Sequence, residues 1–145
     1  KRHILVDTEG FLLKVTVRAA DITDRNAVPL ALAGLATVFP RLRHLWADAG
    51  YSGKGAEWVR ALLGWTVEVV KRPQRWVWLP EGVAPPPIPT GFQVLKRRWV
   101  VERTFAWLGR YRRLSKDYEH NPSCSESVVY IASIRTMLKR LAAHA

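Results

Sequence analysis

Two carboxylates in this chain stand where an acid side chain can take part in chemistry. Glu102 is the only acid between Glu81 and Asp117, and eight Lys and Arg residues lie between positions 96 and 116. Asp48 follows a short apolar run and precedes a glycine-containing turn. Functional acids of α/β folds gather at the carboxyl ends of strands. Because carboxylates bind Mg²⁺ well, the two acids among many cations predict metal-dependent phosphoryl transfer.

Each acid also has a purely structural explanation. Glu102 comes four residues after Arg98, which is the spacing of an ion pair along one face of a helix, worth about 0.2–0.5 kcal/mol. Asp48 is of the type that begins turns and helices, a role that Ser52 can also fill. The residues by themselves leave both explanations open.

The composition indicates a globular domain with a polyanionic partner. The chain has 145 residues, of which 48% are hydrophobic and 24% charged, enough for one domain with a core. Its net charge is +11, and sixteen arginines carry most of it. Arginine matches the geometry of phosphate groups, so we expect a nucleic-acid partner. The alternative is a basic globular protein with no such partner.

Several classes of protein are not expected. No apolar run approaches the roughly 18–20 residues that a membrane span needs, and the amino terminus has no signal-peptide pattern. Cys124 is the only cysteine, so we expect no internal disulfide and a reducing, cytoplasmic environment. The four histidines are scattered, which argues against a structural zinc site.

The periodicity predicts the elements that position the two acids. Residues 4–6 and 11–17 read as an antiparallel hairpin, with Asp7 as the first residue of its turn. A helix is expected around residues 27–32. A strand that ends at Asp48, a helix over 57–63 and a strand over 65–71 form a βαβ pattern, so these two strands should be parallel.

The second half of the chain predicts two helices after an irregular segment. Residues 73–91 are rich in Pro and Trp and read as an exposed loop within the single domain 1–145. Residues 97–113 read as a helix with an apolar stripe of Val94, Val101, Phe105 and Leu108. Ser123 and Glu126 have the spacing of a capping box before a last helix, whose predicted packing face is Val128, Ile131, Ile134, Leu138 and Leu141.

Two motifs resemble the insertion-sequence transposases of the DDE superfamily. Trp46-Ala47-Asp48-Ala49-Gly50-Tyr51 resembles the block around their second catalytic Asp. The run from Arg98 to Leu108 resembles their third-acid helix, summarised as Y-x2-R-x3-E-x6-K. The segments 111–119 and 1–10 are similar to the continuation of that helix and to the hairpin after the first catalytic strand. The resemblance covers nearly the whole chain.

The resemblance implies an incomplete RNase H-like fold, a mixed sheet flanked by helices that lacks its first strand. It implies that Asp48 and Glu102 are catalytic residues and ligands of Mg²⁺ or Mn²⁺, and that Arg98 positions Glu102 or contacts DNA. We expect DNA, both transposon ends and target, to be bound by the basic residues around this helix, which are Arg97, Arg98, Arg103, Arg110, Arg112, Arg113 and Lys116.

The chain departs from the motif at two positions and lacks the first acid. Leu95 stands in place of the motif's Tyr, and Gly109 stands in place of its Lys, with Arg110 next to it. The family's first acid lies on a strand upstream of the hairpin, so we expect little catalysis from this chain alone. The first Asp would come from the product of an upstream reading frame, or the chain is a mobile-element remnant.

The sequence therefore predicts a DNA transposase of bacterial type, cytoplasmic and nucleoid-associated, that cleaves insertion-sequence ends and transfers strands. Self-association on DNA is expected from the family resemblance. The alternative is a basic module that binds DNA or RNA and has no catalytic role.

Overall fold

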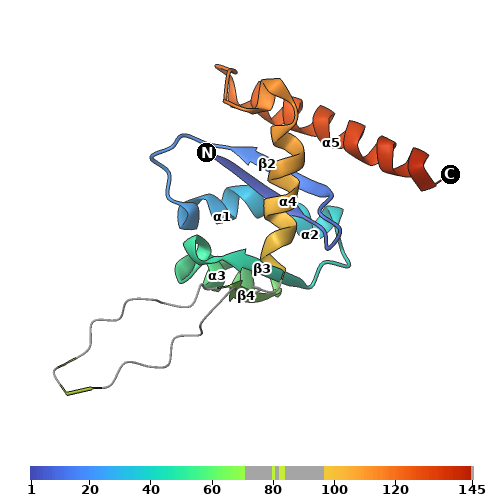
Figure 1. Ribbon diagram of the computed structural model, residues 1–145. Helices are drawn as coiled ribbons and strands as arrows, with labels where there is room; N and C mark the ends of the chain where they lie inside the picture. Colours follow the sequence, from blue (N-terminus) through green and yellow to red (C-terminus); the bar gives the residue numbers. More distant parts are fainter. Residues whose placement is uncertain (71–79, 81, 84–96, 145) are drawn as a thin grey trace.

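The computed structural model describes residues 1–70, 80, 82–83 and 97–144. These residues form the mixed α/β structure that the sequence predicts, with two small sheets and five α-helices among them (Figure 1). The predicted loop at 73–91 lies outside the described residues except at positions 80, 82 and 83.

The predicted hairpin is confirmed. Strands β1 (Arg2–Val6) and β2 (Leu12–Val17) pair antiparallel, with a register shift between Leu5 and Val6. The turn is held by Asp7, whose Oδ1 accepts hydrogen bonds of 2.9 Å from the backbone N–H groups of Glu9 and Phe11. Asp7 is therefore a turn residue, as predicted.

The last helix, α5 (Pro122–His144), packs against β2. Glu126 Oε1 accepts a hydrogen bond of 2.8 Å from the N–H of Val17, and the hydroxyl of Tyr130 lies 3.3 Å from the N–H of Val15. The predicted capping box is therefore wrong, because Glu126 reaches the strand instead of the helix start. Asn121 caps the helix, and its Oδ1 accepts from the N–H of Ser123.

The packing face of α5 also differs from the predicted one. Small side chains face the strand, and the buried residues of the helix are Ser125, Val129, Ala132 and Ser133. They allow the helix backbone to lie close to β2. The larger apolar residues of the predicted face are 50–69% exposed, namely Ile131, Ile134, Leu138 and Leu141.

The predicted parallel pair is confirmed as β3 (His44–Asp48) and β4 (Thr66–Val70). The connection between them contains the 3₁₀ turn η1 (Ala49–Tyr51), helix α3 (Lys54–Trp58) and a π-helical turn, η2 (Val59–Leu63). Helices α1 (Asp24–Leu32) and α2 (Leu35–Val38) precede them. Apolar side chains from these elements form one core, which includes Val28, Leu32, Val59, Trp65 and Val67.

Helix α4 (Arg98–Gly109) is shorter than predicted, and a 3₁₀ turn, η3 (Arg112–Leu114), follows it. It runs from the β3–β4 sheet to α5, across the β1–β2 hairpin (Figure 1). Its buried residues are Val100, Thr104 and Leu108, whereas Phe105 is 40% exposed, so the predicted stripe was right only in part. None of the helices in the described part of the chain is long and apolar enough to cross a membrane.

Candidate functional site

Asp48 and Glu102 come from distant parts of the chain and meet at one guanidinium. Asp48 is the last residue of β3, and its Oδ1 accepts a hydrogen bond of 2.6 Å from the N–H of Ala49. Arg98 Nε lies 3.0 Å from Glu102 Oε1, and Arg98 Nη1 lies 3.9 Å from Asp48 Oδ1. The predicted i,i+4 ion pair is therefore present, and the same arginine also approaches the acid at the strand end.

Both carboxylates are open to solvent and to a ligand. The side chain of Asp48 is 56% exposed and that of Glu102 is 61% exposed, whereas Arg98 is 21% exposed. The guanidinium of Arg98 is a positive charge close to both carboxylates, and it reduces the electrostatic repulsion between them. The site can therefore keep two carboxylates close together in the folded chain.

The donor set suits a hard divalent cation in part. Two carboxylates provide oxygen ligands for Mg²⁺, which usually retains several waters or substrate phosphate oxygens. Within the described residues, no group of three or more His, Cys, Asp and Glu side chains is arranged to hold a metal ion. Asp48 and Glu102 are thus two oxygen donors beside one arginine, and a metal site formed by them would need a further ligand.

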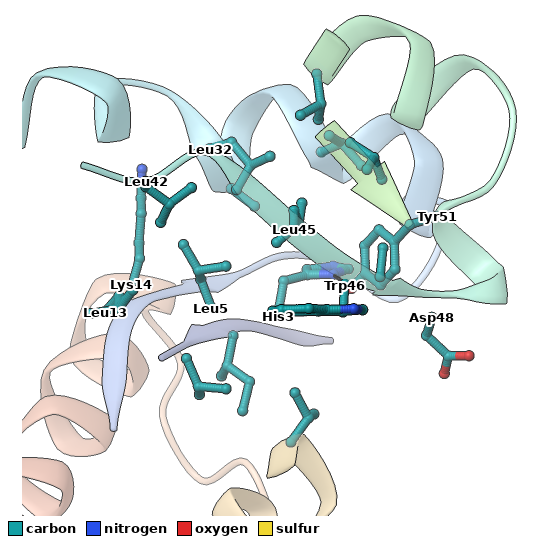
Figure 2. A pocket seen from close by; sticks show the side chains of 18 of the residues that line it. His3, Leu5, Leu13, Lys14, Leu32, Leu42, Leu45, Trp46, Asp48 and Tyr51 are labelled. Carbon is teal, nitrogen blue, oxygen red and sulfur yellow. Dashed lines mark hydrogen bonds between the residues drawn. The ribbon is translucent and has the colours of Figure 1, made fainter. Parts of the chain in front are cut away.

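A buried hydrogen-bonded pair lies behind the Asp48 turn. The hydroxyl of Tyr51 lies 2.8 Å from Nδ1 of His3, which is 5% exposed (Figure 2). Burial, and then the charges of Asp24 and Asp48, raise the pKa of Tyr51 to about 12. Burial also lowers the pKa of His3. At neutral pH the pair is therefore a phenol and an uncharged imidazole.

The turn after Asp48 packs tightly against α1. A Cβ atom at Gly50 would lie 2.8 Å from Oδ2 of Asp24, so glycine permits this approach. Asp24 lies in the first turn of α1, and its carboxylate is 3.6 Å from the ammonium of Lys1. The position of the Asp48 turn is thus fixed by its contact with α1.

Three of the predicted DNA-binding arginines have partners within the fold. The first, Arg98, pairs with the two acids. Arg103 stacks on Trp99 and Trp107, at 4.3 and 4.8 Å from the ring centroids, and donates to the carbonyl of Glu9 at 2.7 Å. The third, Arg113, pairs with Glu119 at 2.8 Å.

The other predicted basic residues are exposed. Arg97 lies over the ring of Trp46, at 5.3 Å, beside the acids. At the far end of α4, Arg110, Arg112 and Lys116 form no ion pair with any described residue. Glu102 and Arg110 are eight residues apart, or about 12 Å along a helix axis. This basic group therefore begins at the C-terminal end of α4, about 12 Å along the helix axis from Glu102.

The comparisons with known proteins now identify the family. Residues 1–123 match the family model described as a transposase DDE domain. The chain belongs to the DDE-domain transposases. It is also 30% identical over 126 residues to a protein of Burkholderia cepacia that is named as a transposase for insertion sequence element IS402. That match covers 82% of this chain and 53% of the relative, so the chain spans about half the length of the relative. No solved structure matches the chain.

Sequence reasoning missed two parts of this transposase domain. It did not predict that Arg98 would approach Asp48, because that contact joins residues fifty positions apart through the tertiary fold. It also missed the pair of His3 and Tyr51. The only local signal was a tyrosine close behind an acid at a strand end, a pattern that does not indicate its partner.

The lowered pKa of His3 predicts a pH-dependent stability of the domain. The unfolded chain takes up a proton near pH 6.5, the ordinary value, and the folded chain does so only at lower pH. The unfolded state then binds more protons, so the free energy of unfolding should fall as pH drops from about 7.5 to about 5.5. Urea titrations at both pH values measure this fall.

His3→Asn should remove part of that pH dependence. His120→Asn is the matched control, because His120 is exposed and takes no part in the pair with Tyr51. An equal pH dependence in wild type and in His3→Asn would contradict the assignment.

Proposed function

We propose that this chain is part of the catalytic domain of an insertion-sequence transposase that cleaves DNA at element ends and transfers strands. Asp48 and Glu102 are its metal-binding catalytic acids, with Mg²⁺ or Mn²⁺ as the ion. The observation that carries the proposal is the position of Arg98, within 3.0 Å of Glu102 and 3.9 Å of Asp48. Membership of the DDE transposase family supports the reaction class.

Each side chain has a definite task in this proposal. Asp48, held by the N–H of Ala49, and Glu102 present oxygen atoms to the ion. Arg98 is a positioning residue, since it fixes the Glu102 carboxylate through a charge-assisted hydrogen bond. The ion would lower the pKa of a water or hydroxyl nucleophile and stabilise charge on the phosphate. Two acids are an incomplete ligand set, so we expect little activity from residues 1–145 alone.

A second candidate function is a basic module that binds DNA or RNA without catalysis, as in a mobile-element remnant. The exposed basic group of Arg110, Arg112 and Lys116 favours it, because this group needs no metal. Both candidates predict nucleic-acid binding. They differ in whether DNA is cut.

The deciding experiment is a cleavage and strand-transfer assay. It uses the element-length protein, meaning the whole transposase encoded by the insertion sequence with residues 1–145 as part of it. The substrate is labelled DNA that carries the element ends. We expect nicks at the ends with Mg²⁺ or Mn²⁺ and none in EDTA, while the DNA stays bound in both. Cleavage that persists without a divalent cation, or binding without any cleavage, would overturn the catalytic proposal.

The dependence of DNA binding on salt should separate the basic residues into two classes. Each phosphate contact contributes about 0.9 to the slope of log K against log salt. Arg110→Gln should lower the slope by about this amount because Arg110 is exposed and forms no ion pair among the described residues. Arg103→Gln should leave the slope unchanged, since Arg103 stacks between two tryptophans. Fluorescence anisotropy at several salt concentrations measures the slope for each variant. Equal slopes for Arg110→Gln and Arg103→Gln would refute the division of the basic residues into two classes.

A further inference from the structure

We infer that Trp46 is a positioning residue, whose indole ring holds Arg97 and thereby keeps the first turn of α4 against β3. In this position Arg98 reaches both Asp48 and Glu102. The link to metal binding rests on the proposed function, whereas the contact between the ring and the helix start does not.

The first turn of α4 is not packed into the core next to β3. That core includes side chains of α1, α3 and β4 and, among the described residues, none of α4. Val100 is buried at the start of the helix but belongs to neither of the two cores. Leu108, at the other end of the helix, packs with β2 and α5. The approach of the first turn to β3 therefore depends on contacts of single side chains.

Arg97, the residue before α4, has a backbone conformation that is unfavourable for arginine. Its φ is +63°, and in the described part of the chain it is the only residue other than glycine with a positive φ. This left-handed region suits Gly, and at times Asn or Asp, whose short side chains bond locally. The helix also begins without a side-chain cap. A contact elsewhere must therefore stabilise the helix start.

The ring of Trp46 supplies such a contact. The Cζ atom of Arg97 lies 5.3 Å from the ring centroid, within the roughly 6 Å of a cation–π interaction. The carbonyl of Arg97 accepts a hydrogen bond of 3.2 Å from the N–H of Val100, in the first turn of the helix. The ring of Trp46 is therefore joined to the first turn of α4 through one residue.

The indole ring is itself held by both strands of the parallel pair. Its Nε1 donates a hydrogen bond of 3.0 Å to Oε2 of Glu68, the residue that pairs with Trp46 in the ladder. The ring of His44 packs edge-on against it at 4.3 Å, and Nδ1 of that histidine lies 2.6 Å from the hydroxyl oxygen of Thr66. These contacts leave the indole little freedom to turn. The indole therefore fixes the guanidinium instead of following it.

Strand β3 thus contacts the start of α4 at two neighbouring points. Trp46 and Asp48 lie on one face of the strand, because alternate residues do so. Their partners, Arg97 and Arg98, are consecutive. The ion pair of Arg98 with Glu102 lies within α4 and moves with the helix, so a shift of the first turn would first break the 3.9 Å approach to Asp48. Trp46 therefore sets how close the two acids lie.

Arg97 is also predicted to bind DNA, and the two roles have different consequences. A guanidinium that contacts phosphate keeps this contact when Trp46 is removed, and its effect appears in the salt dependence of DNA binding. A guanidinium that is held by the ring loses its partner in the same variant, and the effect appears in the helix. Amide hydrogen exchange in α4 can therefore distinguish the two roles.

The first test measures this exchange in the 145-residue chain, without metal or DNA. The N–H of Glu102 bonds back to the carbonyl of Arg98, so its exchange reports the opening of the first turn. Trp46→Leu should speed this exchange about two- to fivefold, the size expected from an exposed cation–π contact. Leu108, at the other end of α4, should exchange as in the wild type. An unchanged rate at Glu102 would overturn the inference.

A double-mutant cycle shows whether the ring acts through Arg97. Arg97→Met keeps most of the length of the side chain and removes its charge, and it should speed exchange at Glu102 as much as Trp46→Leu does. The variant with both changes should exchange no faster than either single variant, because the same contact is lost in all three. If the two increases multiply instead, the residues act independently and the inference is wrong.

Phe11→Leu is the matched control for Trp46→Leu. The guanidinium of Arg140 lies over the ring of Phe11 at 5.2 Å, so the variant removes the same kind of contact at nearly the same distance. This contact joins the hairpin turn to α5 and leaves β3 untouched. Exchange at Glu102 should therefore stay at the wild-type rate. Equal acceleration by the two variants would refute a specific role of Trp46.

The second test measures metal dependence in the element-length protein. Trp46→Leu should raise the Mn²⁺ concentration for half-maximal cleavage about three- to tenfold, less than the roughly 10–100-fold typical of direct partners of metal ligands. DNA affinity should change little, because no phosphate contact is removed. Trp46→Phe keeps a ring beneath the guanidinium and should restore most of the metal affinity. Weaker DNA binding at an unchanged Mn²⁺ requirement would overturn the positioning role.

Failure of this inference is distinct from failure of the proposed function. If the element-length protein cleaves no DNA, the proposed function fails, while exchange at Glu102 in the 145-residue chain still decides whether Trp46 holds α4. If the wild type cleaves DNA with Mn²⁺ but Trp46→Leu leaves exchange at Glu102 unchanged, the inference fails and the proposed function stands.

Discussion

Replacing Gly10 with alanine is expected to destabilise the domain by about 2–5 kcal/mol. Gly10 has φ of +81°, which costs an L-residue roughly 1–2 kcal/mol. A Cβ atom there would lie 2.9 Å from Oγ1 of Thr104, which donates a hydrogen bond of 2.7 Å to the Gly10 carbonyl. Thr104 is buried, so displacing it would cost about a further 1–3 kcal/mol. Urea denaturation measures the change.

The matched control is Gly64→Ala. Gly64 also has a positive φ, of +65°, but a Cβ atom there would meet nothing within 4 Å. Only the backbone cost of about 1–2 kcal/mol should then appear. If both variants lose the same stability, the close contact between the hairpin turn and α4 does not constrain position 10.

The contact at Gly10 matters for the site because it fixes α4. In the hairpin turn, the backbone carbonyl of Gly10 accepts a hydrogen bond from Thr104, and that of Glu9 accepts one from Arg103. Glu102 lies next to Arg103 in the same helical turn. The hairpin therefore sets the position from which Glu102 reaches Arg98 and, through it, Asp48. A glycine that carries no functional group can thus affect the geometry of the acids.

The elements predicted correctly were those with strong local signals. A turn bounded by Asp7 and Gly10 between two apolar runs specifies a hairpin at short range. The strand that ends at Asp48 and the strand expected over residues 65–71 are predicted to be parallel because a helical segment separates them, and β3 and β4 pair in this way. These rules depend on neighbours in the sequence, and the structure follows them.

The helix faces were predicted less well because they depend on tertiary partners. In α4, Thr104 is buried against the hairpin turn, while Phe105 is 40% exposed. In α5, small residues such as Ala132 face β2, while Ile131 and Leu138 remain exposed. Hydrophobic periodicity cannot distinguish these cases, since it ranks side chains by polarity and not by how closely a backbone must approach.

The site followed the same division. The two acids are proposed as site residues from their type and position, Asp48 at a strand end and Glu102 among cations. Their common contact with Arg98 is a tertiary feature, and so is the buried imidazole of His3 behind the Asp48 turn. The sequence motif specifies which residues carry the charge, and the packing of α4 against the hairpin brings those charges together.

Substitution of either acid should have the largest effect on activity. In the element-length protein, Asp48→Asn and Glu102→Gln should each lower DNA cleavage by more than about 100-fold, since even partners of metal ligands typically contribute roughly 10–100-fold. DNA binding should persist or strengthen, because each change removes a negative charge near phosphate. Cleavage rates at saturating protein, with binding measured separately by anisotropy, distinguish the two effects.

Glu119→Gln is the matched control for these substitutions. Glu119 pairs with an arginine as Glu102 does, at 2.8 Å from Arg113, but it lies outside the proposed metal site. Glu119→Gln removes a surface ion pair but no proposed metal ligand, so it should change the cleavage rate by less than about threefold. A metal site at Asp48 and Glu102 therefore requires that their two variants lose cleavage together while Glu119→Gln keeps it. Full cleavage by Glu102→Gln would show that Glu102 is not a catalytic acid, and its ion pair with Arg98 would then be its only role.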